Sequence, residues 1–202
     1  DGYAGYHNFS DDITVVGCLA HARRRFDEAV KSLPKDKKKG SSAAQGLAYC
    51  DRLFALEKEF AKLTPEERYE QRLKQEKPVL DAFSAWAEKR TVAPKSALGK
   101  AMSYLKDQWP YLTNYLKDGR LEISNNRAER SIKSYVIDRK NFLFANTPGG
   151  ATGSAVMFSL IMTALENKLD PWRYLTWLMK NSETVKDVEE LLPWNAPDAC
   201  KI

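Results

Sequence analysis

The stretch EISNNRAERSIKSYVIDRKNFLFANTPGG, which runs from residue 122 to residue 150, organises the rest of this sequence. It opens with a polar turn whose side chains can accept hydrogen bonds from the free N–H groups of a helix start. Asn126 and Glu129, three residues apart, match a capping box. Three apolar residues recur every four positions along the same stretch: Ala128, Ile132 and Val136. This spacing predicts a helix whose apolar stripe faces a core.

Positive charge surrounds this predicted helix. One interpretation is structural: Glu129 is only a cap, and the bases form a solvated face. The other is chemical: Glu129 is a metal-binding carboxylate beside cations that hold phosphates. The residues alone leave both interpretations open. The basic residues concerned are Arg127, Arg130, Lys133, Arg139 and Lys140.

The composition is that of a globular protein. Its 202 residues are 43% hydrophobic and 29% charged, which suits one or two domains with a real core. The formal net charge of +5 is compatible with an acidic partner such as nucleic acid. Three cysteines at irregular spacing argue against a disulfide framework and for the reducing cytoplasm. We find no signal-peptide pattern, and the apolar run at residues 155–165 is too short to span a bilayer, so no membrane partner is expected.

The N-terminal part predicts a loop, a strand and a helix in that order. Residues 1–12 are rich in Gly, Asn and Asp, which is typical of a loop. The β-branched run at residues 13–20 predicts a buried strand, and residues 21–32 predict a helix docked by one face. Three arginines, Arg23 to Arg25, lie at the junction. On a helix such a cluster is either a solvated face or a group that holds phosphates.

A zinc site is a minor alternative in this region. Cys18 and His21 form a C-x-x-H pair, which His7 and Cys50 could complete. The spacing fits no paired zinc-binding pattern. We therefore interpret Cys18 as a buried thiol at the end of the predicted strand.

A mobile connector at residues 33–42 leads into a block that is helical throughout. Thr64, Pro65 and Glu67 predict a helix start with a capping box. The helix that follows should be kinked at Pro78, and a later one should break or bend near Pro110. The block contains no His and no tight acid cluster, so we interpret it as a helical insertion. The inner side of its second helix is predicted to carry Tyr69, Leu73, Leu80, Phe83 and Trp86.

The C-terminal part predicts three further helices. Pro148 and the two glycines after it indicate a turn or helix start, since no Gly-Lys-Ser/Thr follows that would make a phosphate loop. Residues 155–165 are apolar nearly all round, which predicts a buried helix. Residues 183–192 predict a short acidic helix. Asp170 and Pro171 should start a helix between these two, with an inner side formed by Trp172, Leu175 and Leu178.

Two acids have contexts that suit phosphodiester chemistry. Enzymes that cut and join phosphodiesters often hold two divalent ions between carboxylates from separate elements. Asp1 lies in a loop at the start of the chain, and Glu129 lies on a capped helix lined with bases. Mg²⁺ prefers such hard oxygen ligands and keeps several waters. The two residues are therefore candidates for one metal site.

At this point several motifs resemble those of the transposases of the insertion-sequence family IS66. The resemblance covers nearly the whole chain apart from residues 34–118, where only the helical character matches. Because several independent motifs occur in the expected order, the resemblance is specific. In chain order they are DGYAGY, GCLAHARRRF, SNNRAERSIK, RKNFLFANTPGGA, LDPWRYLTWLM and LLPWN.

The resemblance implies an RNase H-like fold with an Asp-Asp-Glu triad, so that this chain is an α/β fragment, mostly α, with a large helical insertion. By the same resemblance, residues 1–158 form part of the catalytic domain, with the insertion at about 34–118, and residues 159–202 form a C-terminal element. Asp1 matches the second Asp and Glu129 the Glu, with Mg²⁺ or Mn²⁺ as cofactor. DNA phosphates would be held or oriented by Arg23, Arg24, Asn126, Arg127, Arg130, Lys133, Arg139 and Lys140.

The implied partners are DNA, at the element's ends and at the target, and further copies of the protein in the active complex. The implied location is the bacterial cytoplasm, at the nucleoid when DNA is bound. The chain starts at Asp1 without an initiator Met, and the triad's first Asp has no match. We therefore expect a fragment that is inactive alone. Two alternatives stay open: a non-enzymatic nucleic-acid-binding module, and an RNase H-like nuclease that cuts without joining.

Overall fold

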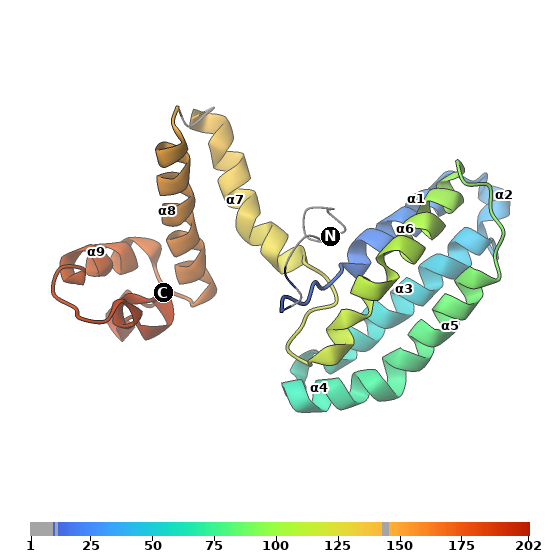
Figure 1. Cartoon of the computed structure of the whole chain (residues 1–202), viewed down its shortest axis with the longest axis horizontal. Helices are drawn as coiled ribbons and strands as arrows, with labels where there is room; N and C mark the ends of the chain where they lie inside the picture. Colours follow the sequence, from blue (N-terminus) through green and yellow to red (C-terminus); the bar gives the residue numbers. More distant parts are fainter. Residues whose placement is uncertain (1–9, 11, 143–145) are drawn as a thin grey trace. The chain divides into compact units, whose positions relative to one another are not determined.

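The structure is a computed structural model that describes residue 10, residues 12–142 and residues 146–202, with only the backbone described for residues 138–142. The chain divides into two compact units, Asp1–Arg127 and Ala128–Ile202. Figure 1 shows each unit as a group of helices. The described residues form no β-strand and only one isolated bridge, between Leu169 and Lys201. The RNase H-like fold and the domain division at residue 158 therefore stay predictions.

Four long helices pack around a single core in the first unit (Figure 1). Phe26 of α1 lies fully buried with Leu53 of α3, Phe83 of α5 and Leu105 of α6. The predicted connector holds only the four-residue α2 (Lys35–Lys38) and Gly40, whose φ of 73° favours glycine. Thus α1 shares its core with the helical block instead of forming a separate piece. The four helices are α1 (Leu19–Lys31), α3 (Ser42–Glu59), α5 (Lys77–Glu88) and α6 (Ala97–Leu112).

The strand predicted at residues 13–20 is wrong. Residues 14–18 have no regular secondary structure, and α1 already begins at Leu19. The Gly17 N–H donates to the Tyr111 carbonyl at 2.8 Å, and the Asn114 side chain donates to the Val15 carbonyl at 2.7 Å. A Cβ on Gly17 would lie 2.9 Å from the backbone nitrogen of Leu112. The segment therefore satisfies its backbone groups against the end of α6, which approaches too closely for a side chain.

The capping signals within the helical block are confirmed. Thr64 and Glu67 form the predicted capping box at the start of α4 (Pro65–Gln71). The Glu67 N–H donates to the Thr64 hydroxyl at 3.3 Å, and the Thr64 N–H donates to the Glu67 carboxylate at 2.9 Å. The break or bend predicted near Pro110 is not a break at Pro110 itself, because α6 continues through this residue and ends at Leu112; the bend stays a prediction.

The distortion predicted at Pro78 takes the form of a π turn, η3 (Arg72–Glu76), which directly precedes α5. A proline inside a helix lacks one N–H and clashes with the carbonyl four residues earlier, and a π turn is one way to accommodate this. The wider turn shifts the helical register. Tyr69 and Leu73, predicted to point inward, are each 39% exposed. Arg72 and Glu76 are buried in their place.

Arg72 is the most completely hydrogen-bonded side chain of the first unit. Its Nε and Nη2 contact the two carboxylate oxygens of Glu57 at 2.6 and 2.9 Å. Its Nη1 donates to the carbonyls of Tyr115 and Asp118 at 3.1 and 3.0 Å, and Nη2 also donates to the Leu121 carbonyl at 2.8 Å. All five N–H groups of the guanidinium therefore have acceptors. We call Glu57, Arg72, Glu76 and Tyr115 the buried polar network.

The second acid of this network has an unusual proton affinity. Glu76 accepts a hydrogen bond from the Tyr115 hydroxyl at 2.8 Å. Burial raises the pKa of Glu76 from its ordinary value of 4.5 to about 7; the Tyr115 hydrogen bond opposes the rise and nearby Glu57 adds to it. Burial and the negative charge of Glu76 likewise raise the pKa of the Tyr115 phenol. At neutral pH Glu76 is therefore poised between its neutral and charged forms.

In the second unit three helices are followed by short 3₁₀ turns. Tyr174 of α9 is fully buried beside Leu169 and Cys200, and its hydroxyl donates to the Leu191 carbonyl at 2.9 Å. Asp170 caps α9 as predicted, accepting from the Arg173 N–H at 3.0 Å. The helices are α7 (Asn126–Phe142), which begins in the first unit, α8 (Pro148–Glu166) and α9 (Pro171–Asn181).

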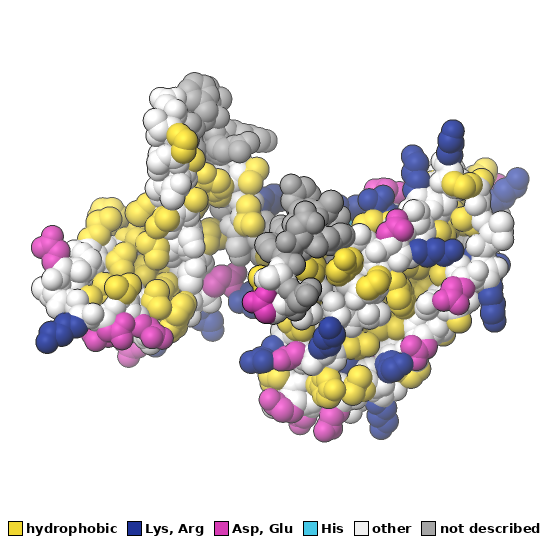
Figure 2. Space-filling view, in the orientation of Figure 1, with side chains coloured by type: hydrophobic (Ala, Val, Ile, Leu, Met, Phe, Trp, Pro, Cys, Tyr) yellow, Lys and Arg dark blue, Asp and Glu magenta, His cyan; other side chains and the backbone are white. Residues whose placement is uncertain are grey.

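Several burial predictions for this unit are wrong. Ile132 and Val136 are 60% and 46% exposed, so the stripe predicted to face a core is open. Trp172 is 80% exposed, whereas Leu175 and Leu178 pack against the core as predicted. Figure 2 shows hydrophobic side chains at the surface of this unit. Within the part of the unit that the structure describes, neighbouring residues cover too little of these helices to bury them.

The apolar helix predicted at residues 155–165 exists but is not buried. It forms part of α8, in which only Ala164 is buried. Thr147 caps α8, accepting from the Gly150 N–H at 3.0 Å, so the glycines mark a helix start as predicted. With 19 residues, α8 is long and apolar enough to cross a membrane, a test that core helices of soluble proteins also pass. In place of the acidic helix predicted at residues 183–192, the structure has only a short 3₁₀ turn, Val188–Leu191.

Glu76 should make the first unit lose stability as the pH rises. Because its folded-state pKa is above its ordinary value, this carboxyl contributes most below pH 4.5, and the contribution is lost between about pH 4.5 and 7. Glu76→Gln keeps an acceptor for Tyr115 but cannot ionise. The free energy of unfolding of the Glu76→Gln variant, relative to that of the parent chain, should therefore rise between about pH 4.5 and 7. Urea denaturation between pH 4.5 and 8 measures the difference in free energy of unfolding between this variant and the parent chain. The control is Glu88→Gln, which changes an exposed carboxylate. If the difference for Glu76→Gln does not change with pH, the raised pKa of Glu76 is contradicted.

Candidate functional site

Three of the residues predicted to hold DNA line one hollow of about 590 Å³ in the first unit. Arg23 and Arg24 come from α1, and Asn126 is the first residue of α7. These residues are far apart in the sequence and belong to two different motifs. We call this site the arginine hollow; it is lined by Ala20, Arg23, Arg24, Asp27, Asp51, Phe54 and Asn126.

Backbone contacts just before α7 bring Asn126 to α1. The Leu19 N–H donates to the Ile123 carbonyl at 3.0 Å, and Ile123 is itself buried. The Asn125 N–H approaches the Cys18 sulfur at 3.4 Å. The chain therefore enters α7 from a point fixed against the start of α1. The helix start predicted here is confirmed to within one residue, since Asn126 is the first helical residue and not the cap before it.

The three arginines of α1 have different surroundings. Arg23 forms an ion pair with Asp51 of α3 at 2.6 Å. The Arg25 guanidinium lies over the Tyr104 ring, 4.4 Å from its centroid. Arg24 is exposed and forms no ion pair with the residues that the structure describes. All three side chains are exposed, so the arrangement is compatible with a solvated face as well as with phosphate binding, and Arg24 is the one most available to an external anion.

Sequence analysis missed the two acids of the arginine hollow. Asp27 forms an ion pair with Lys31 at 2.6 Å, and Asp51 holds Arg23. The spacing of Asp27 and Lys31, four residues apart on a predicted helix, was a usable signal. Asp51 lies on another helix, so no local pattern could have paired it with Arg23. Within the lining the two acids offset the charges of Arg23 and Arg24, so Arg24 is the one lining cation that no described carboxylate pairs.

In the second unit α7 carries a polar face. At 100° per residue, Glu129, Arg130 and Lys133 point to one side, while Ser131 and Tyr135 point to the opposite side, toward α8. All three polar residues of this face are exposed, and Glu129 lies in the first turn. An acid flanked by two bases on an exposed face can contribute a metal ligand beside phosphate contacts.

Other predicted residues are placed only in part. Arg127 lies 3.6 Å from Glu122, and both side chains are about half exposed. Arg139 and Lys140 fall within α7, but their side chains lie outside the described part of the structure, as does the whole of Asp1. The proposed meeting of Asp1 with Glu129 therefore stays a prediction.

No three His, Cys, Asp or Glu side chains gather as a metal site would require in the part of the chain that the structure describes. Carboxylate chemistry at Glu129 suits Mg²⁺, but the described residues do not supply the rest of a ligand set. The zinc alternative gains no support: Cys18 and Cys50 are buried free thiols, and His7 lies outside the described residues. Burial raises the pKa of Cys50 to about 12, which disfavours the thiolate that zinc needs.

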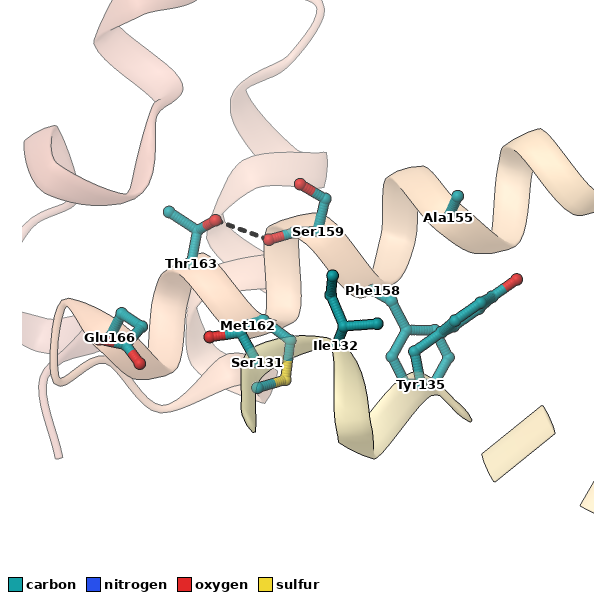
Figure 3. A pocket seen from close by; sticks show the side chains of 9 residues that line it. All are labelled: Ser131, Ile132, Tyr135, Ala155, Phe158, Ser159, Met162, Thr163 and Glu166. Atoms are coloured by element: carbon teal, nitrogen blue, oxygen red, sulfur yellow. Dashed lines mark hydrogen bonds between the residues drawn. The ribbon is translucent and has the colours of Figure 1, made fainter. Parts of the chain in front are cut away.

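A second hollow, of about 440 Å³, lies between α7 and α8 (Figure 3). The Tyr135 and Phe158 rings meet edge to face at 4.9 Å, and the Thr163 hydroxyl donates to the Ser159 carbonyl at 2.7 Å. Among the described residues that line it, Glu166 is the only acid, and none is a Lys or Arg. The described lining is largely apolar and offers no cation to a phosphate.

Comparison with known families agrees with the motifs. The family model "Transposase IS66 family" matches residues 1–153, and the model "IS66 C-terminal element" matches residues 159–194. The chain therefore belongs to the IS66 transposase family. The two motifs that meet in the arginine hollow both lie in the first matched region.

Similar proteins from Sinorhizobium fredii include y4hP, y4jD and y4qI, each described as uncharacterized and each 32% identical to this chain. The matches cover 90%, 96% and 98% of this chain respectively. They cover only 35%, 40% and 39% of those proteins, so the chain spans well under half the length of these curated relatives. No solved structure matches it.

Proposed function

We propose that this chain is the part of a DNA transposase that contributes the Glu of the catalytic triad and holds DNA phosphates in the arginine hollow. The observation that carries the proposal is that Arg23 and Arg24 of one family motif line the same hollow as Asn126 of another. Phosphate binding requires cations and N–H donors that converge on one place. The family supports transposition as the overall reaction and DNA as the partner.

Each residue of the hollow would have its own role. Arg24, which has no ion pair with described residues, would make the direct contact with a phosphate. Arg23 would exchange Asp51 for phosphate when DNA arrives, which keeps the site from binding anions indiscriminately. The Asn126 carboxamide would donate a hydrogen bond that fixes the position of the strand at the start of α7.

Along α7, Arg127, Arg130 and Lys133 would extend the phosphate contacts, followed by Arg139 and Lys140. Glu129 and Asp1 would each supply a carboxylate to Mg²⁺ or Mn²⁺, together with an Asp from elsewhere in the intact protein. When bound, the metal activates the attacking water or 3′-hydroxyl and stabilises charge on the phosphate. We expect the chain alone to be inactive, and the intact protein to act as a multimer on DNA in the bacterial cytoplasm.

Removing the charge of Arg24 should weaken DNA binding through salt-dependent contacts. For the 202-residue chain and a short duplex, the slope of log K against log salt should fall by about 1 in Arg24→Gln, because one phosphate contact is lost. Lys38→Gln removes the same charge from α2, where Lys and Arg side chains gather at one end of the unit (Figure 2), and should change the slope less. Equal slopes for both variants would exclude the arginine hollow as the phosphate site.

Glu129→Gln should separate catalysis from binding. In an intact transposase that contains this chain, it should lower strand transfer by at least about a hundredfold while duplex affinity stays unchanged, because a metal ligand is lost and no phosphate contact is. Glu122→Gln, which removes a nearby carboxylate, should retain strand transfer. If Glu129→Gln keeps full strand-transfer activity, Glu129 is not a metal ligand and only caps the start of α7. Cleaved DNA without joined DNA from the parent protein would instead indicate a nuclease.

A further inference from the structure

A groove of about 610 Å³ lies in the first unit between α3 and α5, and it shares no lining residue with the arginine hollow. The two helices run side by side there (Figure 1). The groove is lined by the small residues Ala48, Pro78 and Ala82, by the rings of Tyr49 and Trp86, and by Gln45 and Val79. Arg52, an exposed residue, also lines it. We call it the α3–α5 groove; its volume is within the range of small-ligand sites.

Trp86 is held in one orientation at the groove. Its indole N–H donates to the Gln45 side-chain oxygen at 3.0 Å, and Arg90 donates to the same oxygen at 3.0 Å. The inner part of the ring contacts the core, with its centroid 5.9 Å from that of Phe83. The ring is half-buried, so part of it stays open toward the groove. A fixed and accessible indole face is a ready surface for stacking.

The charge around the groove is positive and uncompensated. Neither Arg52 nor Arg90 forms an ion pair with a described carboxylate. The acids next to the groove already have partners: Asp51 is bound to Arg23, and Asp81 is bound to Lys77 at 2.8 Å. The Arg90 guanidinium lies over the Trp86 ring, 5.5 Å from its centroid, so a base that stacks on this indole would lie beside it or displace it. An anionic ligand with a flat aromatic part complements this arrangement.

We propose that the α3–α5 groove binds an unpaired nucleotide of DNA, with its base stacked on Trp86 and its phosphate beside Arg52. A protein helix seated in the groove would leave both guanidinium groups without anions unless it were acidic, whereas each nucleotide brings one phosphate with its base. Cutting and joining of DNA ends exposes unpaired nucleotides, so such a site would hold a strand during the reaction. The site does not depend on Glu129 or on the arginine hollow.

The test uses the 202-residue chain with a fluorescently labelled oligothymidylate of about 12 nucleotides, and fluorescence anisotropy as the readout. Trp86→Ala should weaken binding roughly 5- to 150-fold, the cost of losing one base stack. Trp86→Phe should retain most of the affinity, and Trp172→Ala, which removes an exposed indole from α9, should leave it unchanged. Arg52→Gln should reduce the salt slope by about 0.7, because one single-strand phosphate contact is lost.

A second variant covers the case in which Trp86→Ala disturbs the core. Ala82 is exposed and lines the groove, so Ala82→Glu fills the groove with a negative charge and removes no core contact. It should weaken oligothymidylate binding at least as much as Trp86→Ala does, while its thermal unfolding and its affinity for duplex DNA match those of the parent chain. If folded Ala82→Glu binds oligothymidylate as the parent chain does, or if it loses duplex binding equally, the inference is overturned.

Discussion

A buried arginine is the constraint on which the first unit depends. Arg72 enters the core through a π turn and brings a charge that is costly to bury unless every donor is satisfied. Glu57 neutralises it from α3, and the three carbonyls that complete it belong to Tyr115, Asp118 and Leu121. These carbonyls lie on the segment between the last helix of the bundle and the start of α7. The hydrogen bonds from Arg72 to these carbonyls therefore fix the path by which the chain reaches Asn126.

Close packing along the same path supports this constraint. A Cβ on Gly119 would lie 1.8 Å from the Pro65 carbonyl oxygen, so the turn that serves Arg72 tolerates no side chain there. Ile123, a few residues further on, is buried and accepts a hydrogen bond from Leu19 at the start of α1. The helical block thus does more than fill an insertion. It holds α1 and the start of α7 together, which is what forms the arginine hollow.

The sequence predicted the helix starts and caps correctly, because these depend on residues that are close together in the chain. The capping box at Thr64 and the helix starts at Asp170 and near Asn126 need only neighbouring residues, and all were predicted to within a residue. The π turn was not predictable, because its register depends on Pro78 and on partners for Arg72 more than forty residues away. The short β-branched run before α1 illustrates an ambiguity that periodicity cannot resolve. The apolar composition of α8 predicted burial, yet burial depends on what covers the helix.

The candidate site shows the same division. Arg23, Arg24 and Asn126 could be named from charge, side-chain chemistry and resemblance, but their meeting in one hollow depends on contacts of Cys18, Leu19 and Ile123. The α3–α5 groove was missed altogether, because its two aromatic lining residues, Tyr49 and Trp86, lie on separate helices and look like core residues in the sequence.

The most direct test of this dependence is the free energy of unfolding of Arg72→Ala, measured by urea denaturation beside that of Lys31→Gln, which breaks the exposed pair with Asp27. Removing one partner of a buried pair leaves Glu57 uncompensated, so Arg72→Ala should lose roughly 3–5 kcal/mol. Lys31→Gln should change the value by less than about 0.5 kcal/mol. If Arg72→Ala unfolds within about 0.5 kcal/mol of the parent chain, the buried arginine does not hold this unit together.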